Sequence, residues 1–145
     1  MTFDEMTLDI NQTVEINAKP EKVFQAMLHR LGKGNVRPNG ESMDMRIEPK
    51  AGGRWYRDRG NGIEHLWGFV QAIKPGELLE MSGPMFMSYP AINHLEMKIT
   101  AGGSGGTKLT LRHRAIGMID PEHRKNVTHG WGHIMSNIKG DSESK

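Results

Sequence analysis

The sequence predicts an α+β fold in which a curved antiparallel β-sheet wraps around a long C-terminal α-helix. Several segments with a hydrophobic period of two precede one long amphipathic helical segment, and one shorter helical segment follows the first strand. The connections between strands have hairpin length, whereas a parallel crossover needs a dozen or more residues. With 145 residues the chain fits one domain, which we expect over residues 1–140, followed by a short polar tail over 141–145.

The first strand and the first helix have clear signals. Apolar and polar residues alternate over 7–17, which is typical of a strand with one buried face. Pro20 then suits the first helical position, and Phe24, Met27 and Leu31 follow at helical spacing. We therefore expect a helix over 20–31.

The middle of the chain predicts three strands. Residues 43–47 alternate, and residues 54–58 and 63–73 are separated by a polar, glycine-bearing turn that favours a hairpin. Strict alternation in the last of these places five side chains on one face: Ile63, His65, Trp67, Phe69 and Ile73.

The second half predicts three further strands and an apolar loop. We expect strands over 77–81, 93–101 and 107–116, the last two joined by Gly102-Gly103-Ser104-Gly105-Gly106. Residues 82–90 contain too much proline for a central strand, so we expect an apolar loop there.

The last element is a long helix. Asp120 can accept backbone N–H donors as the N-cap, and Pro121 suits the first turn. Apolar residues recur every three or four positions, Trp131 among them, and we expect the helix to close near Gly140.

Composition excludes several classes of function. The chain has no cysteine, so it lacks disulfides and thiolate chemistry, and this suits a reducing compartment. Lysine and arginine exceed aspartate and glutamate by only 19 to 17, which argues against a nucleic-acid partner. The first residues do not form a secretory signal, and no apolar run approaches the roughly 20 residues of a membrane span. We expect a cytoplasmic protein without membrane insertion.

Two motifs have weak chemical signals. The glycine-rich turn at 102–106 matches the Gly-x-Ser-x-Gly pattern of a nucleophile elbow, but that motif needs a following helix, and here a strand follows. His129 and His133 are four apart on a helix, a spacing that can hold a metal, yet no third ligand is evident and both face away from the predicted core. We expect no catalytic residue, no metal site and no cofactor.

Two strand histidines leave a choice open. Alternation places His65 beside Trp67, and His113 beside Leu111, on apolar faces. Either histidine could hydrogen-bond a ligand in a cavity, or be a buried histidine that is paired within the protein.

The chain resembles the SRPBCC superfamily, also known as START-like or birch-pollen-allergen-like, and within it the branch of heat shock protein 90 ATPase activator homologues. The residues that carry the resemblance occur in the same order as in the family: Val14 to Ala18, Pro20 to Phe24, Gly52-Gly53, Gly68 to Ile73, Glu77-Leu78-Leu79, Gly106 to Leu111 and Gly130-Trp131. Lys19 departs from the family pattern, which often has a helix-capping serine at this position. It implies the helix-grip fold, with a cavity between the sheet and the long helix. Members of the superfamily bind lipids, steroids and polyketides, and a minority are cyclases, hydrolases or chaperone partners.

We therefore expect a protein that binds an apolar, lipid-like small molecule under the last helix. The expected cavity-lining residues are His65, Trp67, Phe69, Met85, Met97, Leu111, His113 and Trp131. A cyclase or hydrolase that uses His65 or His113 stays open as an alternative. A chaperone-associated module with a role in the stress response, which would use an exposed loop at Met85-Phe86-Met87, stays open too, as does a homodimer.

Overall fold

Seven antiparallel strands form one continuous sheet in the computed structural model, which describes residues 2–144. The strand order is β1-β7-β6-β5-β4-β3-β2, and every pair of neighbours is antiparallel. The strands are β1 (Thr7–Ile16), β2 (Met45–Ile47), β3 (Arg54–Asp58), β4 (Glu64–Lys74), β5 (Leu78–Gly83), β6 (Ala91–Ala101) and β7 (Thr107–Gly117). This sheet with its C-terminal helix confirms the predicted α+β, helix-grip fold.

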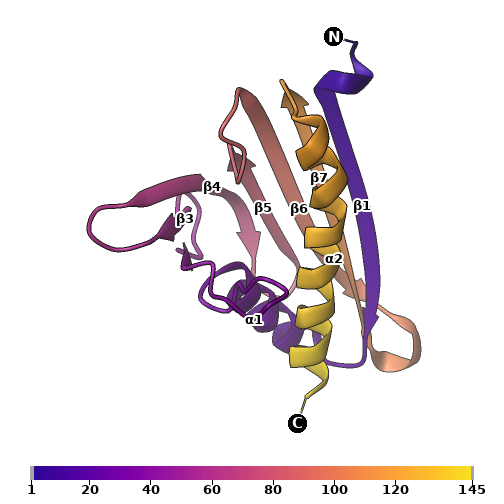
Figure 1. The fold of residues 1–145 in the computed structure, drawn as a ribbon. Coiled ribbons are helices and arrows are strands. Elements are labelled where there is room, and N and C mark those ends of the chain that lie inside the picture. The colour runs from indigo at the N-terminus through magenta and orange to yellow at the C-terminus, as the bar shows by residue number, and fades with distance from the viewer. Residues whose placement is uncertain (1, 145) are drawn as a thin grey trace.

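Two helices lie against the same side of the sheet. Helix α2 (Pro121–Glu143) runs lengthwise beside β1, β6 and β7, and α1 (Pro20–Leu31) lies near the C-terminal end of α2, while the β3–β4 hairpin curls away from the helix (Figure 1). Short 3-10 turns at Asp4–Met6 and Gly103–Gly105 complete the structure. The second of these joins β6 to β7, so the glycine-rich segment is a hairpin tip, as predicted. Among residues 2–144, neither helix combines the length and the apolar content that a membrane span requires.

Helix α2 begins as predicted but ends later. The Asp120 carboxylate accepts hydrogen bonds from the backbone N–H groups of Glu122, at 2.8 Å, and His123, at 3.5 Å. The helix passes through Gly140 and continues to Glu143, so residues 141–143 are helical where we expected a short polar tail beyond the helix; Lys145 lies outside the described residues. Arg30 of α1 explains the extension, because its guanidinium binds both oxygens of Asp141, at 2.6 and 2.9 Å.

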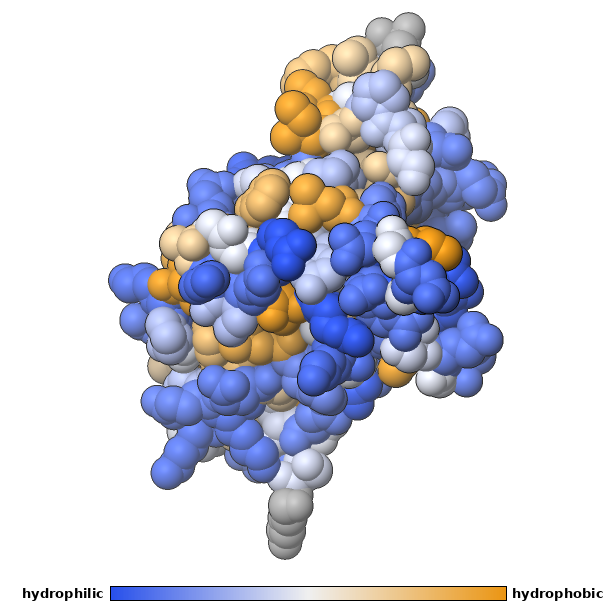
Figure 2. Space-filling model, turned by 90° about the vertical axis from the view of Figure 1, so that its left-hand side faces the viewer, coloured by the Kyte–Doolittle hydropathy of each residue, from blue (hydrophilic) through white to orange (hydrophobic). Residues whose placement is uncertain are grey.

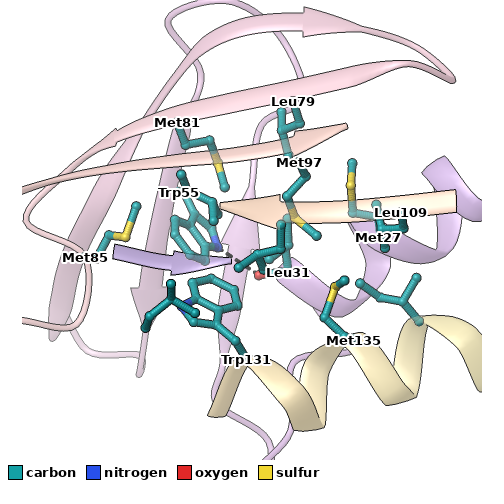
Figure 3. Close-up of a cluster of buried hydrophobic side chains, with 14 of the residues drawn as sticks. Met27, Leu31, Trp55, Leu79, Met81, Met85, Met97, Leu109, Trp131 and Met135 are labelled. Carbon is teal, nitrogen blue, oxygen red and sulfur yellow. Dashed lines mark hydrogen bonds between the residues drawn. The ribbon is translucent and has the colours of Figure 1, made fainter. Parts of the chain in front are cut away.

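Methionine fills much of the core between these layers. Met27 of α1, Met81 of β5, Met97 of β6 and Met135 of α2 are buried together with Leu and Trp side chains (Figure 3). Unbranched, flexible side chains suit the irregular gap between a twisted sheet and a helix. This core packs against the inner face of α2, where Met135 and Ile138 are buried.

A β-bulge reverses the expected face of half of β4. Trp55 pairs with Gly68 but the next residue, Tyr56, pairs with Leu66, so Trp67 is an extra residue on β4. Trp67 points inward and is buried, whereas Phe69 is 47% exposed and Ile63 is 59% exposed. The prediction that strict alternation puts Phe69 on the buried face with Trp67 was therefore wrong, and Ile63 lies in the turn before β4 and is exposed for that reason.

Candidate functional site

A pocket of about 790 Å³ lies beside the N-terminal half of α2. One wall is the face of α2 between His123 and Ile134, and the opposite wall is the loop over residues 35–38 together with Met43. Trp55 of β3, Trp67 of β4 and Phe86 of the β5–β6 loop also line it. The volume falls in the range of roughly 300–1,000 Å³ that is usual for small-molecule sites.

All three tryptophans of the chain line this pocket, from three different elements. The rings of Trp55 and Trp67 are 5.1 Å apart in a T-shaped contact, and Phe86 contacts Trp67 at 5.4 Å and Trp131 at 6.4 Å. Such edge-to-face contacts are the favoured geometry of aromatic pairs. They hold the rings as a rigid, apolar wall.

Each indole N–H is already hydrogen-bonded inside the protein. Trp55 donates to the backbone carbonyl of Leu31 at 2.8 Å, Trp67 to Nδ1 of His65 at 3.2 Å, and Trp131 to Nδ1 of His113 at 3.0 Å. Because these donors already have partners, the indole rings can contact a ligand in the pocket only through their apolar surface.

A series of buried hydrogen bonds holds the indole of Trp131 in place. His113 is fully buried on β7, and its Nε2 lies 2.7 Å from the Oδ1 of Asn93, whose amide nitrogen donates to the carbonyl of Pro84 at 3.1 Å. Since Nδ1 accepts from Trp131, Nε2 of His113 is the protonated nitrogen and donates to Asn93. Burial, assisted by nearby His123, lowers the pKa of His113 to about 4. His113 is therefore neutral, and both of its nitrogens have partners.

The β5–β6 loop closes one end of the pocket. Met85 and Met87 are buried, and the N–H of Met85 donates to the carbonyl of Trp67 at 2.7 Å. Only Phe86 of this loop lines the pocket. The expectation of an exposed Met85-Phe86-Met87 surface was wrong, because the two methionines insert into the core and turn the loop inward.

His123 joins this loop to α2. Its Nδ1 lies 2.6 Å from the hydroxyl of Tyr89, and its ring contacts Phe86 with centroids 4.9 Å apart. Burial lowers the pKa of His123 and raises the pKa of Tyr89. The Tyr89–His123 contact thus links the β5–β6 loop, which closes one end of the pocket, to α2.

The structure brings only some of the expected site residues to the pocket. Trp67 and Trp131 line it. His65 and His113 do not, but each holds one of these tryptophans by its indole N–H. Met85, Met97 and Leu111 are buried in the core, and Phe69 points outward.

Several pocket residues were not predicted. Trp55, Arg37 and His123 line the pocket, and so do His129 and His133, which we expected only to face away from the core. Trp55 had a signal, since it lies in the predicted strand that forms a hairpin with the strand of Trp67. Arg37 had none, because its loop reaches the pocket only through the tertiary fold. Residues 2–144 contain no group of three or more His, Cys, Asp or Glu side chains that could hold a metal.

Solved structures share this fold over nearly the whole chain. A protein from Chromobacterium violaceum has 19% sequence identity and a TM-score of 0.70, with 94% of this chain and 98% of that chain covered. Ara h 8.0201 has 14% identity and a TM-score of 0.63, with 92% and 96% covered. The di-domain ARO/CYC StfQ of the steffimycin biosynthetic pathway has 12% identity and a TM-score of 0.67, with 97% of this chain but only 52% of StfQ covered.

Sequence comparison identifies the family. Among curated proteins, none matches the chain. The family described as Activator of Hsp90 ATPase homolog 1-like protein matches residues 17–140, which include α1, the strands β2 to β7 and most of α2. The match therefore takes in every element that contributes to the pocket, and the chain belongs to the Activator of Hsp90 ATPase homolog 1-like family.

Proposed function

We propose that this protein binds an apolar small molecule in the pocket beside the N-terminal half of α2. The observation that carries the proposal is a cavity of about 790 Å³ walled by three indole rings whose N–H groups are all bonded elsewhere. Trp55, Trp67 and Trp131 are themselves only 0%, 7% and 3% exposed, so the gain comes from the apolar lining as a whole. Covering that lining with a ligand stabilises the complex by about 25 cal/mol for each Å² of apolar surface removed from water.

Two glycines in α2 support the proposal. Gly130 and Gly132 line the pocket, and a Cβ atom placed on either would meet no atom within 4 Å. A glycine inside a helix costs about 1 kcal/mol relative to alanine. Packing within the protein does not require either glycine, and the bare helix backbone at these positions leaves room for a ligand to lie against α2.

The alternative of a histidine-dependent enzyme has less support. His113 is neutral, fully paired and separated from the pocket by Trp131, and Nδ1 of His65 is occupied by Trp67. General acid–base catalysis needs a group within hydrogen-bond reach of the substrate. Neither histidine lines the pocket.

The test introduces a larger side chain on the α2 wall of the pocket. Gly130 lines the pocket and Gly140 does not, and a Cβ atom at either position would meet no atom within 4 Å. Gly130→Leu therefore adds a side chain to the wall of the pocket, and the matched control Gly140→Leu adds the same side chain to the same helix away from it. Binding of the neutral probe N-phenyl-1-naphthylamine is measured by its fluorescence.

We expect the wild-type protein and Gly140→Leu to bind the probe equally, and Gly130→Leu to bind it at least tenfold more weakly. Circular dichroism checks that all three proteins are folded. Equal binding by both variants, or no binding by the wild type, contradicts the proposal.

A further inference from the structure

The titratable side chains that line the pocket are all basic. They are Arg37, His123, His129 and His133, and no Asp or Glu is among the lining residues that the structure describes. The whole chain has 17 acidic residues against 19 lysines and arginines, so this bias is a local property. On the hairpin side of the molecule, apolar surface lies open between strongly hydrophilic residues (Figure 2).

Arg37 has donors to spare at the edge of the pocket. Its side chain is 47% exposed, and its closest carboxylate oxygen, from the 67% exposed Glu41, is 3.8 Å away. Its Nε points to the sulfur of Met43 at 3.3 Å, which is a weak acceptor. A guanidinium has five N–H donors, so most of those on Arg37 have no strong protein partner.

The backbone positions this guanidinium beside the apolar wall. The N–H of Arg37 donates to the carbonyl of Glu41, and the carbonyl of Arg37 accepts from Gly40, both at 2.8 Å. This turn fixes the position of Arg37 in the loop that forms the pocket wall opposite α2. From α2, the exposed His129 and the half-buried His133 line the same pocket.

An apolar interior with a basic edge selects a ligand of matching polarity. We propose that the natural ligand is an amphiphile with an apolar body and an acidic head group of the carboxylate class, and that Arg37 binds the head group while the body lies against Trp67, Phe86 and Trp131. This inference rests on the proposed function and deepens it. A planar guanidinium matches a carboxylate with two parallel hydrogen bonds.

The experiment compares two ligands that differ only in the head group. Dodecanoate and dodecan-1-ol are titrated separately against bound N-phenyl-1-naphthylamine, with the wild-type protein, Arg37→Gln and Arg59→Gln. Arg59 is exposed on the β3–β4 turn and does not line the pocket, so it controls for the loss of one positive charge.

We expect the wild type to bind dodecanoate about tenfold more tightly than dodecan-1-ol, since a hydrogen bond to a charged group is worth about that factor or more. Arg37→Gln should remove this preference and leave the affinity for dodecan-1-ol unchanged. Arg59→Gln should keep both affinities.

Three results overturn the inference. The first is equal affinity of the wild type for dodecanoate and dodecan-1-ol, and the second is an equal loss of affinity for both compounds in Arg37→Gln. Either result shows that Arg37 does not bind the head group, while the proposed binding of an apolar ligand is unaffected. If neither compound displaces the probe and Gly130→Leu binds it normally, the proposed function fails and this inference fails with it.

Discussion

Acidification provides a quantitative test of the buried hydrogen bonds that hold Trp131. The pKa of His113 is about 4 in the folded protein and has its ordinary value of 6.5 in an unfolded chain. Between these values the unfolded chain binds a proton that the folded protein excludes. Stability is therefore complete above pH 6.5 and falls as the pH decreases toward 4.

The magnitude follows from the difference between the two pKa values. One unit of pKa corresponds to about 1.4 kcal/mol, so His113 alone should lower the free energy of unfolding by about 2 kcal/mol between pH 8 and pH 5. His123 adds a loss in the same direction, because burial lowers its pKa as well. The carboxyl groups of Asp9 and Asp141, whose pKa values are lowered mainly by hydrogen bonds from Arg112 and Arg30, respond at lower pH.

The assay is urea denaturation at several pH values, combined with an NMR titration of the histidine ring protons. The unfolding curves of His113→Gln should depend less on pH than those of the wild type, by about 2 kcal/mol over the same interval. The exposed His129, replaced by glutamine, serves as the control and should keep the wild-type dependence. A ring signal of His113 that titrates near pH 6.5 in the folded wild type refutes the reasoning, whatever the variant does.

Four further substitutions test the elements around the pocket, each by urea denaturation. Trp55→Phe removes the donor to the carbonyl of Leu31 and should cost about 1–3 kcal/mol, and a neutral result contradicts the role of this bond. Asp120→Ala removes the N-cap of α2 and should cost about 1 kcal/mol, whereas an unchanged stability means that the cap is not needed. Gly130→Ala and Gly140→Ala should each stabilise the ligand-free protein by up to about 1 kcal/mol, and a loss at Gly130 would mean that the fold itself requires the glycine.

Local signals in the sequence were sufficient for most elements. The helix over 20–31 has the predicted bounds, since Pro20 and the spacing of Phe24, Met27 and Leu31 act within one element. Asp120 caps α2 for the same reason, because a cap depends on its own next residues. The order of these elements then leaves few ways to form a sheet with one covered face.

The features that were missed depend on contacts between elements. A period of two cannot reveal the extra residue at Trp67, so the outward position of Phe69 appears only in the pairing with β3. The end of α2 is set by Arg30, which is more than a hundred residues away along the chain. The pocket follows the same rule, because Arg37 reaches it on a loop without a regular pattern.

The central claim is that an apolar molecule occupies the pocket beside α2, and the three tryptophans report on it directly. Trp55, Trp67 and Trp131 are the only tryptophans of the chain and all line the pocket, so a ¹⁵N-indole NMR spectrum contains signals from this site alone. Titration with dodecan-1-ol should shift the Trp67 and Trp131 signals saturably, and the shifts should be lost in Gly130→Leu. Indole signals that do not move, or that move equally in Gly130→Leu, contradict the account.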